Sequence, residues 1–403
     1  MELSIYIHFP FCVKRCNYCD FNTYAGKENQ IPDYTRAMIR EIQIVANRLN
    51  GKYPVHTLYF GGGTPSLMQG TEMQKIIAEI KNSFDLAPNL EITLEANPGT
   101  VDRFKLAQFR EIGINRLSFG VQSFQAEELK ILGRVHTAEE AEKAFTDARH
   151  CGFENINLDL IYGLPAQTLE KWKATLQKAI NLKPAHLSLY SLLVEPGTLL
   201  ETQIRCGKLL EPDVDLAAEM YEWAMDNLPQ ENFQQYEISN WCRVDKNGSH
   251  WVSLHNLQYW KNQPYLGIGA GAHGFILGTR TENVKEIETY INKININKPS
   301  RKGVSPANKS VTDITLWEEI QETMMLGLRL TQQGIGDGEF KIRFGNNMES
   351  LFTKEIDSLL HQELLEWGIL EGDRILRLTR KGRMLGNRVF SEFVGNRPPK
   401  DFR

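Results

Sequence analysis

Three cysteines, Cys12, Cys16 and Cys19, lie close together near the start of the 403-residue chain. A loop with thiols at this spacing can wrap one small inorganic group, because thiolates bind iron and zinc strongly. Three thiolates leave one iron of a four-iron cluster without a protein ligand, so a further molecule could bind there. Zinc would need a fourth protein ligand, and His8 could supply it. The spacing therefore predicts a metal centre, either an open iron–sulfur cluster or zinc.

The remaining cysteines, Cys151, Cys206 and Cys242, are scattered, which does not fit a disulfide framework. Clustered thiols without an export signal indicate a reducing compartment, so we expect the cytoplasm. The net charge of −4 argues against a protein that coats nucleic acid. A content of 41% hydrophobic and 24% charged residues is typical of globular proteins. No apolar run is long enough to cross a bilayer.

Short β-rich segments alternate with helical periodicity over the first 190 or so residues, a pattern that indicates β/α units. We expect strands at 3–8, 56–60, 91–96, 116–119, 155–161 and 186–191. We expect helices at 32–49, 71–84, 102–112, 138–151 and 169–182. This order predicts a parallel sheet, because parallel strands need crossover helices. Since a closed barrel needs eight units, the expected α/β fold is a partial (β/α)6 barrel, with an open doubly wound sheet as the alternative.

The sequence divides into four expected parts. Residues 1–200 form the partial barrel, 201–290 extend it, 291–312 form a basic linker, and 313–403 form a small, mostly α, winged-helix-like domain with a hairpin at 370–378. The linker prediction rests on five basic and no acidic residues between Thr289 and Thr312. Such a segment could contact anionic lipid, but a solvated linker is the preferred interpretation. Nucleic-acid binding by the basic last domain is not expected.

Glycines and polar residues follow the later strands, at the edge where barrel proteins place their sites. Gly61, Gly62, Gly63 and Thr64 follow the second strand, and glycines let free backbone N–H and C=O groups approach a ligand, although a tight turn is the alternative. Further polar residues occur near the ends of the next three strands: Glu95, Gln122, Arg134 and Asp159. We expect Arg134 to be a partner of the buried Asp159 carboxylate.

The CxxxCxxC spacing after the first strand, with Tyr18 before the third cysteine, resembles the signature of radical S-adenosylmethionine (SAM) enzymes. The fold of that superfamily is a partial (β/α)6 barrel. The resemblance implies that Cys12, Cys16 and Cys19 hold a [4Fe–4S] cluster. It also implies that SAM chelates the fourth iron and that a flavodoxin or ferredoxin supplies electrons.

The segments YIHFP, GGGTP, GVQSF and NLDLIYGLP are similar to the oxygen-independent coproporphyrinogen III oxidase family and its close relatives. Two groups of residues would line the site by this resemblance. The cluster-bound SAM would contact Tyr6, Gly62, Gly63, Thr64 and Glu95. The adjacent region, where the oxidase holds a second SAM, would be lined by Gln122, Arg134 and Asp159.

The chain departs from the oxidase pattern near its cysteines. Phe21 stands where the oxidase has a further cysteine, and the extended segment that precedes the oxidase cluster is not found before Cys12. A different motif is present instead, and it resembles the HNxxYW motif of HemW-type heme chaperones: His255, Asn256, Tyr259 and Trp260. Imidazole is a common ligand of heme iron, and aromatic rings can pack against a porphyrin.

The resemblance therefore implies a protein that binds heme and passes it to respiratory apo-proteins, with the cluster and SAM controlling transfer. Peripheral membrane contact and a homodimer are further expectations. We expect His255 to contact heme, with His250 or His273 as a second ligand, and a helix cap or core histidine as the alternative. The competing interpretation is an enzyme, the oxygen-independent coproporphyrinogen III oxidase. A radical SAM enzyme with another substrate is the third.

Overall fold

The computed structural model describes residues 2–49, 53–245, 248, 250–298, 303–399 and 402. Its main sheet contains twelve strands, and the central six are parallel and follow one another in chain order. These are β1 (Leu3–Phe9), β4 (Val55–Gly62), β5 (Leu86–Ala96), β6 (Arg116–Gln122), β7 (Asn155–Tyr162) and β8 (His186–Ser191). All six expected strands and their parallel order are therefore confirmed. The side chains of β1 are buried on both faces except Tyr6, as expected for a central parallel strand.

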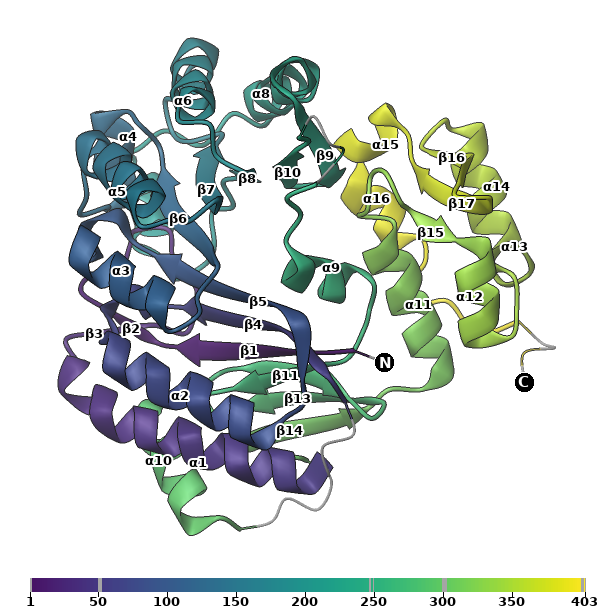
Figure 1. Cartoon of the computed structure of the whole chain (residues 1–403). Helices are drawn as coiled ribbons and strands as arrows, with labels where there is room; N and C mark the ends of the chain where they lie inside the picture. Colours follow the sequence, from purple (N-terminus) through teal and green to yellow (C-terminus); the bar gives the residue numbers. More distant parts are fainter. Residues whose placement is uncertain are drawn as a thin grey trace.

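Helices connect successive parallel strands and cover the outer face of the curved sheet (Figure 1). They are α1 (Ile31–Leu49), α2 (Gly70–Ser83), α3 (Arg103–Glu111), α4 (Ala126–Leu132), α5 (Ala138–His150) and α6 (Leu169–Asn181), and after β8 come α7 (Leu199–Arg205) and α8 (Val214–Asn227). The five expected helices are present, and α4 is an addition. Side chains at helical spacing, such as Met38, Ile42 and Val45 of α1, join the sheet in one continuous hydrophobic core.

The sheet extends beyond the six parallel strands on both sides. Next to β1 lies β11 (Tyr265–Ile268), which is parallel to it, followed by antiparallel β12 (His273–Ile276), β13 (Thr279–Asn283) and β14 (Asn308–Asp313). Next to β8 lie β10 (Asn240–Arg243) and β9 (Phe233–Glu237), both in antiparallel pairs. The sheet order runs from β14 to β9, so the barrel is open over the described residues.

The segment expected as a linker, 291–312, belongs to this extension. It contains the end of α10 (Ile287–Ile296) and most of β14, whose backbone pairs with β13. Residues 299–302, with two of the five bases, lie outside the described residues. The prediction of a linker is therefore wrong for the described residues of this segment. Its polar and basic composition suits the half-exposed edge strand of a sheet equally well.

The C-terminal region has a hydrophobic core of its own, formed by Trp317, Phe340, Phe352 and other side chains. Its helices are α11 (Leu316–Gly327), α12 (Asp337–Phe344), α13 (Met348–Leu351), α14 (Thr353–His361), α15 (Arg380–Met384) and α16 (Gly386–Ser391). Its small sheet contains β15 (Ile335–Gly336), β16 (Leu365–Leu370) and β17 (Asp373–Leu378). The expected hairpin is thus present, formed by β16 and β17.

Several arginines of the C-terminal region are paired with acids. Arg374 forms a two-pronged contact with Glu349 at 3.0 Å, Arg377 lies 2.8 Å from Glu366, and Arg380 pairs with Asp226 of α8. These pairs reduce the positive charge available to a nucleic acid. None of the helices in the described part of the chain is long and apolar enough to span a bilayer.

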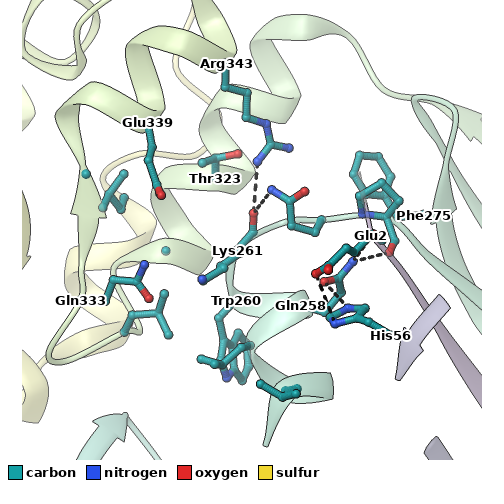
Figure 2. Close-up of a pocket in the computed structure, with 18 of the residues that line it drawn as sticks. Glu2, His56, Gln258, Trp260, Lys261, Phe275, Thr323, Gln333, Glu339 and Arg343 are labelled. Carbon is teal, nitrogen blue, oxygen red and sulfur yellow. Dashed lines mark hydrogen bonds and ion pairs between the residues drawn. The ribbon is translucent and has the colours of Figure 1, made fainter. Parts of the chain in front are cut away.

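Residues after α9 (Leu254–Trp260) connect the sheet to the C-terminal region. The Asn262 side chain donates to Thr323 of α11 (3.1 Å) and accepts from Arg280 of β13 (2.9 Å). Arg343 of α12 donates to the carbonyl oxygens of Lys261 (3.1 Å) and Asn262 (2.7 Å). Figure 2 shows this junction beside a cavity of about 1010 Å³, with Arg343 above Lys261.

The buried carboxylate of Glu41 connects α1 to the β11–β14 extension. It accepts hydrogen bonds from Gly269 N (2.8 Å), Asn283 Nδ2 (2.9 Å), Tyr290 Oη (2.6 Å) and the Ser305 hydroxyl. Four donors from four later segments thus converge on one fully buried side chain. Removing an acceptor of this kind leaves buried donors without partners.

We predict that Glu41→Ala lowers the free energy of unfolding by about 3 kcal/mol or more, because several buried donors lose their acceptor. Urea unfolding followed by circular dichroism measures this change. The matched control is Glu127→Ala, which removes an exposed carboxylate from α4. Equal unfolding midpoints for the two variants would contradict the role given to Glu41.

Candidate functional site

The three clustered cysteines lie on one loop after β1, at the carboxyl ends of the parallel strands. The loop is held by the short pair β2 (Phe11–Cys12) and β3 (Tyr24–Ala25). Asn17 fixes its centre, since its backbone N–H and side chain donate to Leu132 and Ile131 of α4 at 3.0 and 2.8 Å. The loop therefore has a defined place above the sheet. Cys12, Cys16 and Cys19 all line one cavity of about 510 Å³.

Each thiol has a polar neighbour inside this cavity. Thr64 Oγ1 donates to Cys12 Sγ at 3.6 Å, and Arg134 Nη1 donates to Cys16 Sγ at 3.2 Å. Burial raises the pKa of Cys12 to about 11, against the weaker opposing effect of Thr64, so metal binding would have to displace its proton. Hydrogen-bond donors directed at sulfur, such as these two, stabilise thiolates that are bound to a metal centre.

The cavity fits a cluster better than a single zinc ion. Cys12, Cys16 and Cys19 all line it. His8 does not line this cavity: its ring nitrogens contact Tyr6 Oη and the Asn22 carbonyl oxygen, both at 3.0 Å. The zinc alternative that used His8 as a fourth ligand is therefore wrong. Three thiols with adjoining space suit a [4Fe–4S] cluster that keeps one iron open.

The glycines after β4 bring the cysteine loop close to the sheet. Gly62 has φ +112°, and a Cβ there would lie 2.5 Å from the His8 ring. A Cβ on Gly63 would lie 2.6 Å from the carbonyl oxygen of Phe11. The N–H of Gly63 donates to the carbonyl oxygen of Phe9 at the end of β1, and the N–H of Thr64 donates to that of Phe11 at the start of the cysteine loop, both at 2.8 Å. The expectation of free N–H groups is wrong for Gly63 and Thr64, because both groups already have these acceptors; their contact with SAM stays a prediction.

Glu95, at the end of β5, is a carboxylate that lines the cysteine cavity. It accepts hydrogen bonds from Tyr59 Oη (2.8 Å) and from Gly62 N (3.1 Å). Removal from water and the nearby charge of Asp159 together raise its pKa to about 7, against the opposing effects of Tyr59, Gly62 and Arg116. Glu95 can therefore change charge near neutral pH while remaining close to a bound ligand.

Asp159 on β7 lines the same cavity but has other partners than expected. Its carboxylate accepts hydrogen bonds from Ser118 Oγ and Asn157 Nδ2, both at 2.9 Å. Arg134 instead donates to the Gly120 carbonyl oxygen at 2.6 Å and to Cys16. Arg134, the partner expected for Asp159, thus makes its hydrogen bonds elsewhere and connects the cysteine loop to β6. Burial acts to lower the pKa of Arg134, but Tyr18, Cys16 and, to a smaller extent, the nearby charge of Asp159 raise it above its ordinary value.

The structure brings most of the predicted site residues into this one cavity. They are Cys12, Cys16, Tyr18, Cys19, Gly62, Gly63, Thr64, Glu95, Gln122, Arg134 and Asp159. Gln122 has φ +68°, a strained conformation for a residue other than glycine. The sequence analysis missed Tyr59, Ser118 and Tyr190, which also line the cavity. Tyr59 lies in the second half of β4 and Tyr190 near the carboxyl end of β8, which was the available signal, whereas Ser118 lies near the start of β6 and gave no such signal.

A second cavity of about 660 Å³ adjoins the first, and Phe21, Gly62 and Glu95 line both. Three of the remaining predicted residues line the second cavity and not the first: Tyr6, Tyr259 and Trp260. The structure therefore separates Tyr6 from the cysteines. Its predicted contact with SAM is not tested by this arrangement and stays a prediction.

His255 and Asn256 do not line either cavity. The His255 ring is buried, with Nδ1 2.7 Å from Thr57 Oγ1 and Nε2 2.8 Å from Tyr259 Oη. Burial lowers the pKa of His255 to about 3, so the ring is neutral. Direct binding of His255 to heme iron would require one of these hydrogen bonds to break. Asn256 lies in the first turn of α9, where its N–H donates to the cap residue Ser253.

The two other histidines named from the sequence lie in different places. His250 is exposed on the loop before α9 and pairs with Val244 in an isolated β-bridge. His273 begins β12, is exposed, and lines the second cavity. Only His273 of these two is therefore near Tyr259 and Trp260 in that cavity.

Comparisons with known proteins agree with this architecture. Residues 6–179 match the Radical SAM superfamily, and residues 314–385 match the HemN C-terminal domain. The solved structure of coproporphyrinogen III oxidase from Escherichia coli, a radical SAM enzyme, superposes with a TM-score of 0.82 over 98% of this chain and 90% of that one. The identity is 23%, so this likeness shows the fold alone.

Sequence relatives identify the family more closely. Heme chaperone HemW of Bacillus subtilis is 38% identical over 397 residues, which are 97% of this chain and 99% of that protein. Heme chaperone HemW of Escherichia coli is 41% identical over 274 residues, 68% of this chain and 70% of that protein. The chain therefore belongs to the HemW family within the radical SAM superfamily.

Proposed function

We propose that this protein is a heme chaperone that binds heme beside a SAM-liganded [4Fe–4S] cluster and passes heme to apo-proteins of the respiratory chain. The observation that carries the proposal is the pair of adjoining cavities, one lined by three thiols and the other by aromatic rings. The name of its relatives, heme chaperone, supports the same function. We place this activity in the cytoplasm, with a peripheral membrane contact at the point of delivery.

Cys12, Cys16 and Cys19 would hold the cluster. When bound, the cluster and SAM supply one-electron chemistry, and a flavodoxin or ferredoxin would reduce the cluster. The chain's own residues bind and orient: Arg134 neutralises charge at the Cys16 sulfur, and Glu95 offers a hydrogen-bond acceptor to the amino group of SAM. We further propose that heme transfer needs SAM binding and that two copies of the chain associate during loading.

An oxygen-independent coproporphyrinogen III oxidase is the second candidate, because that enzyme shares the fold. Phe21 argues against it: this side chain is 63% exposed and lines both cavities where the oxidase pattern has a further cysteine. An exposed aromatic ring at the boundary of two cavities suits contact with a flat apolar ligand. Relatives at 38% and 41% identity are named heme chaperones, which favours the first function.

One assay separates the two functions. The reconstituted protein is mixed anaerobically with SAM, a reductant and coproporphyrinogen III, and in parallel it is titrated with heme. We expect no protoporphyrinogen and a saturable Soret band, because the site is proposed to carry a porphyrin without changing it. Formation of protoporphyrinogen with turnover would refute the chaperone proposal.

The cluster assignment predicts the effect of removing one thiol. Cys16→Ser should lower iron and sulfide content at least tenfold after anaerobic reconstitution, because the remaining two thiolates cannot hold the cluster. Cys206→Ser removes an exposed thiol far along the chain and should keep the wild-type content. If both variants bound equal amounts of iron, the three-cysteine assignment would be wrong.

The raised pKa of Glu95 predicts how SAM binding depends on pH. Below about pH 7 the carboxyl group is protonated, and above it the carboxylate can accept from the SAM amino group, so affinity should rise from pH 6 to pH 8. The Glu95→Gln variant cannot gain this charge, so its affinity should change several-fold less over the same range. Equilibrium dialysis of the reconstituted proteins measures SAM affinity at each pH. If the affinities of wild type and Glu95→Gln changed equally with pH, Glu95 would not be the group responsible.

A further inference from the structure

We propose that heme binds in the second cavity, between β12, α9 and α11, and that His273 is the residue that ligates its iron. This inference rests on the proposed chaperone function and locates its ligand site. It assigns iron binding to a residue outside the HNxxYW motif. His255 then acts as a positioning residue that fixes α9 and the Tyr259 ring.

The size and walls of the cavity suit a large flat ligand. Its volume of about 660 Å³ lies within the ~300–1,000 Å³ range of ligand pockets. Tyr259 and Tyr265 line it as an edge-to-face pair with ring centroids 4.6 Å apart, and Trp260 lies beside them. On the C-terminal side the wall contains Met325 and Leu326 of α11. Aromatic and aliphatic walls of this kind are the usual contacts of a porphyrin ring.

His273 is the histidine that can reach heme iron without breaking an existing contact. Its ring is exposed to the cavity and has no hydrogen-bond partner within the described residues. The other histidine of this cavity, His8, is buried and has both ring nitrogens occupied. His255 is likewise occupied on both nitrogens and does not line the cavity. Neutral, uncommitted imidazole is the form that binds heme iron.

Basic residues of the same cavity can meet the two heme propionates. Lys285 is exposed and lines the cavity. Arg280 also lines it, held by Glu322 at 2.6 Å and by Tyr265 at 3.3 Å. A propionate carboxylate would accept charge-assisted hydrogen bonds from Lys285, whereas Arg280 already shares its charge with Glu322. The cavity thus offers an iron ligand, flat walls and a lysine at its edge.

The segment that carries His273 is tied to the cysteine loop. Asn22 Nδ2 donates to the carbonyl oxygens of Ala270 and Lys285, both at 3.0 Å. Gly271 leaves room for this contact, because a Cβ there would lie 2.5 Å from Asn22. Changes at the metal centre can therefore alter the position of His273 through one side chain, which connects the two proposed binding events.

The test is anaerobic heme titration of the full-length protein and its variants, followed by Soret absorbance and by magnetic circular dichroism. We expect His273→Ala to weaken heme binding at least tenfold and to lose the histidine-ligated spectrum, and added imidazole to restore that spectrum. His250→Ala, which removes an exposed histidine outside the cavity, should behave as wild type. We expect His273→Cys to give a thiolate-ligated spectrum, which no purely structural effect would produce.

The outcomes distinguish the site from the function. If His273→Ala keeps the wild-type spectrum and an affinity within twofold of His250→Ala, the assignment of His273 is wrong while the chaperone function stands. If the wild-type protein binds no heme, the proposed function and this inference both fail. If the alanine variant loses circular dichroism signal, the His273→Cys spectrum decides, and a spectrum identical to wild type overturns the proposal.

Discussion

The structure depends on one close approach, between the cysteine loop and the glycines at the end of β4. The N–H groups of Gly63 and Thr64 donate to the carbonyl oxygens of Phe9 and Phe11, where β1 passes into the loop. A Cβ on Gly63 would overlap this backbone, and a Cβ on Gly62 would overlap the His8 ring of β1. This contact sets the distance between the three thiols and the carboxyl edge of the sheet. The cavity lined by Glu95 and Asp159 exists because the loop is held there. A larger residue at Gly63 would change the fold of the loop and the binding site together.

The same loop forms the boundary between two binding regions. Its thiols face the first cavity, its Phe21 side chain lines both, and its Asn22 side chain holds the segment with His273. A metal centre on the loop is therefore mechanically connected to the second cavity through neighbouring residues. This arrangement gives a physical reason for a chaperone to keep the cofactors of a radical SAM protein. We propose that the cofactors govern when heme is held, without chemical change to heme.

Much of this architecture could be predicted from the sequence. The six parallel strands were predictable because each is a short apolar run between helical segments, and the cysteine cluster because its spacing alone restricts the chemistry. The strands of the extension were harder to detect, since β12, β13 and β14 have only four to six residues and few apolar ones. The scarcity of apolar residues is also the reason why the sequence predicted a linker at 291–312.

Side-chain partners could not be predicted from strand order. Arg134 was a sensible partner for Asp159, but α4 directs it to the cysteine loop, whereas Ser118 on the adjacent strand satisfies the carboxylate. His255 lies in a recognisable motif, yet its contacts with Thr57 and Tyr259 depend on how α9 packs against β4. In both cases the hydrogen-bond partner depends on which residues lie side by side on neighbouring elements. A single sequence does not reveal this proximity.

The central claim is that three thiolates hold a cluster with one iron open to SAM. Iron and sulfide analysis of anaerobically reconstituted protein, combined with electron paramagnetic resonance of the reduced form with and without SAM, tests it directly. We predict four irons and four sulfides per chain, as in one [4Fe–4S] cluster, and a resonance that changes when SAM is added. Zinc in place of iron, or a resonance indifferent to SAM, would contradict the account.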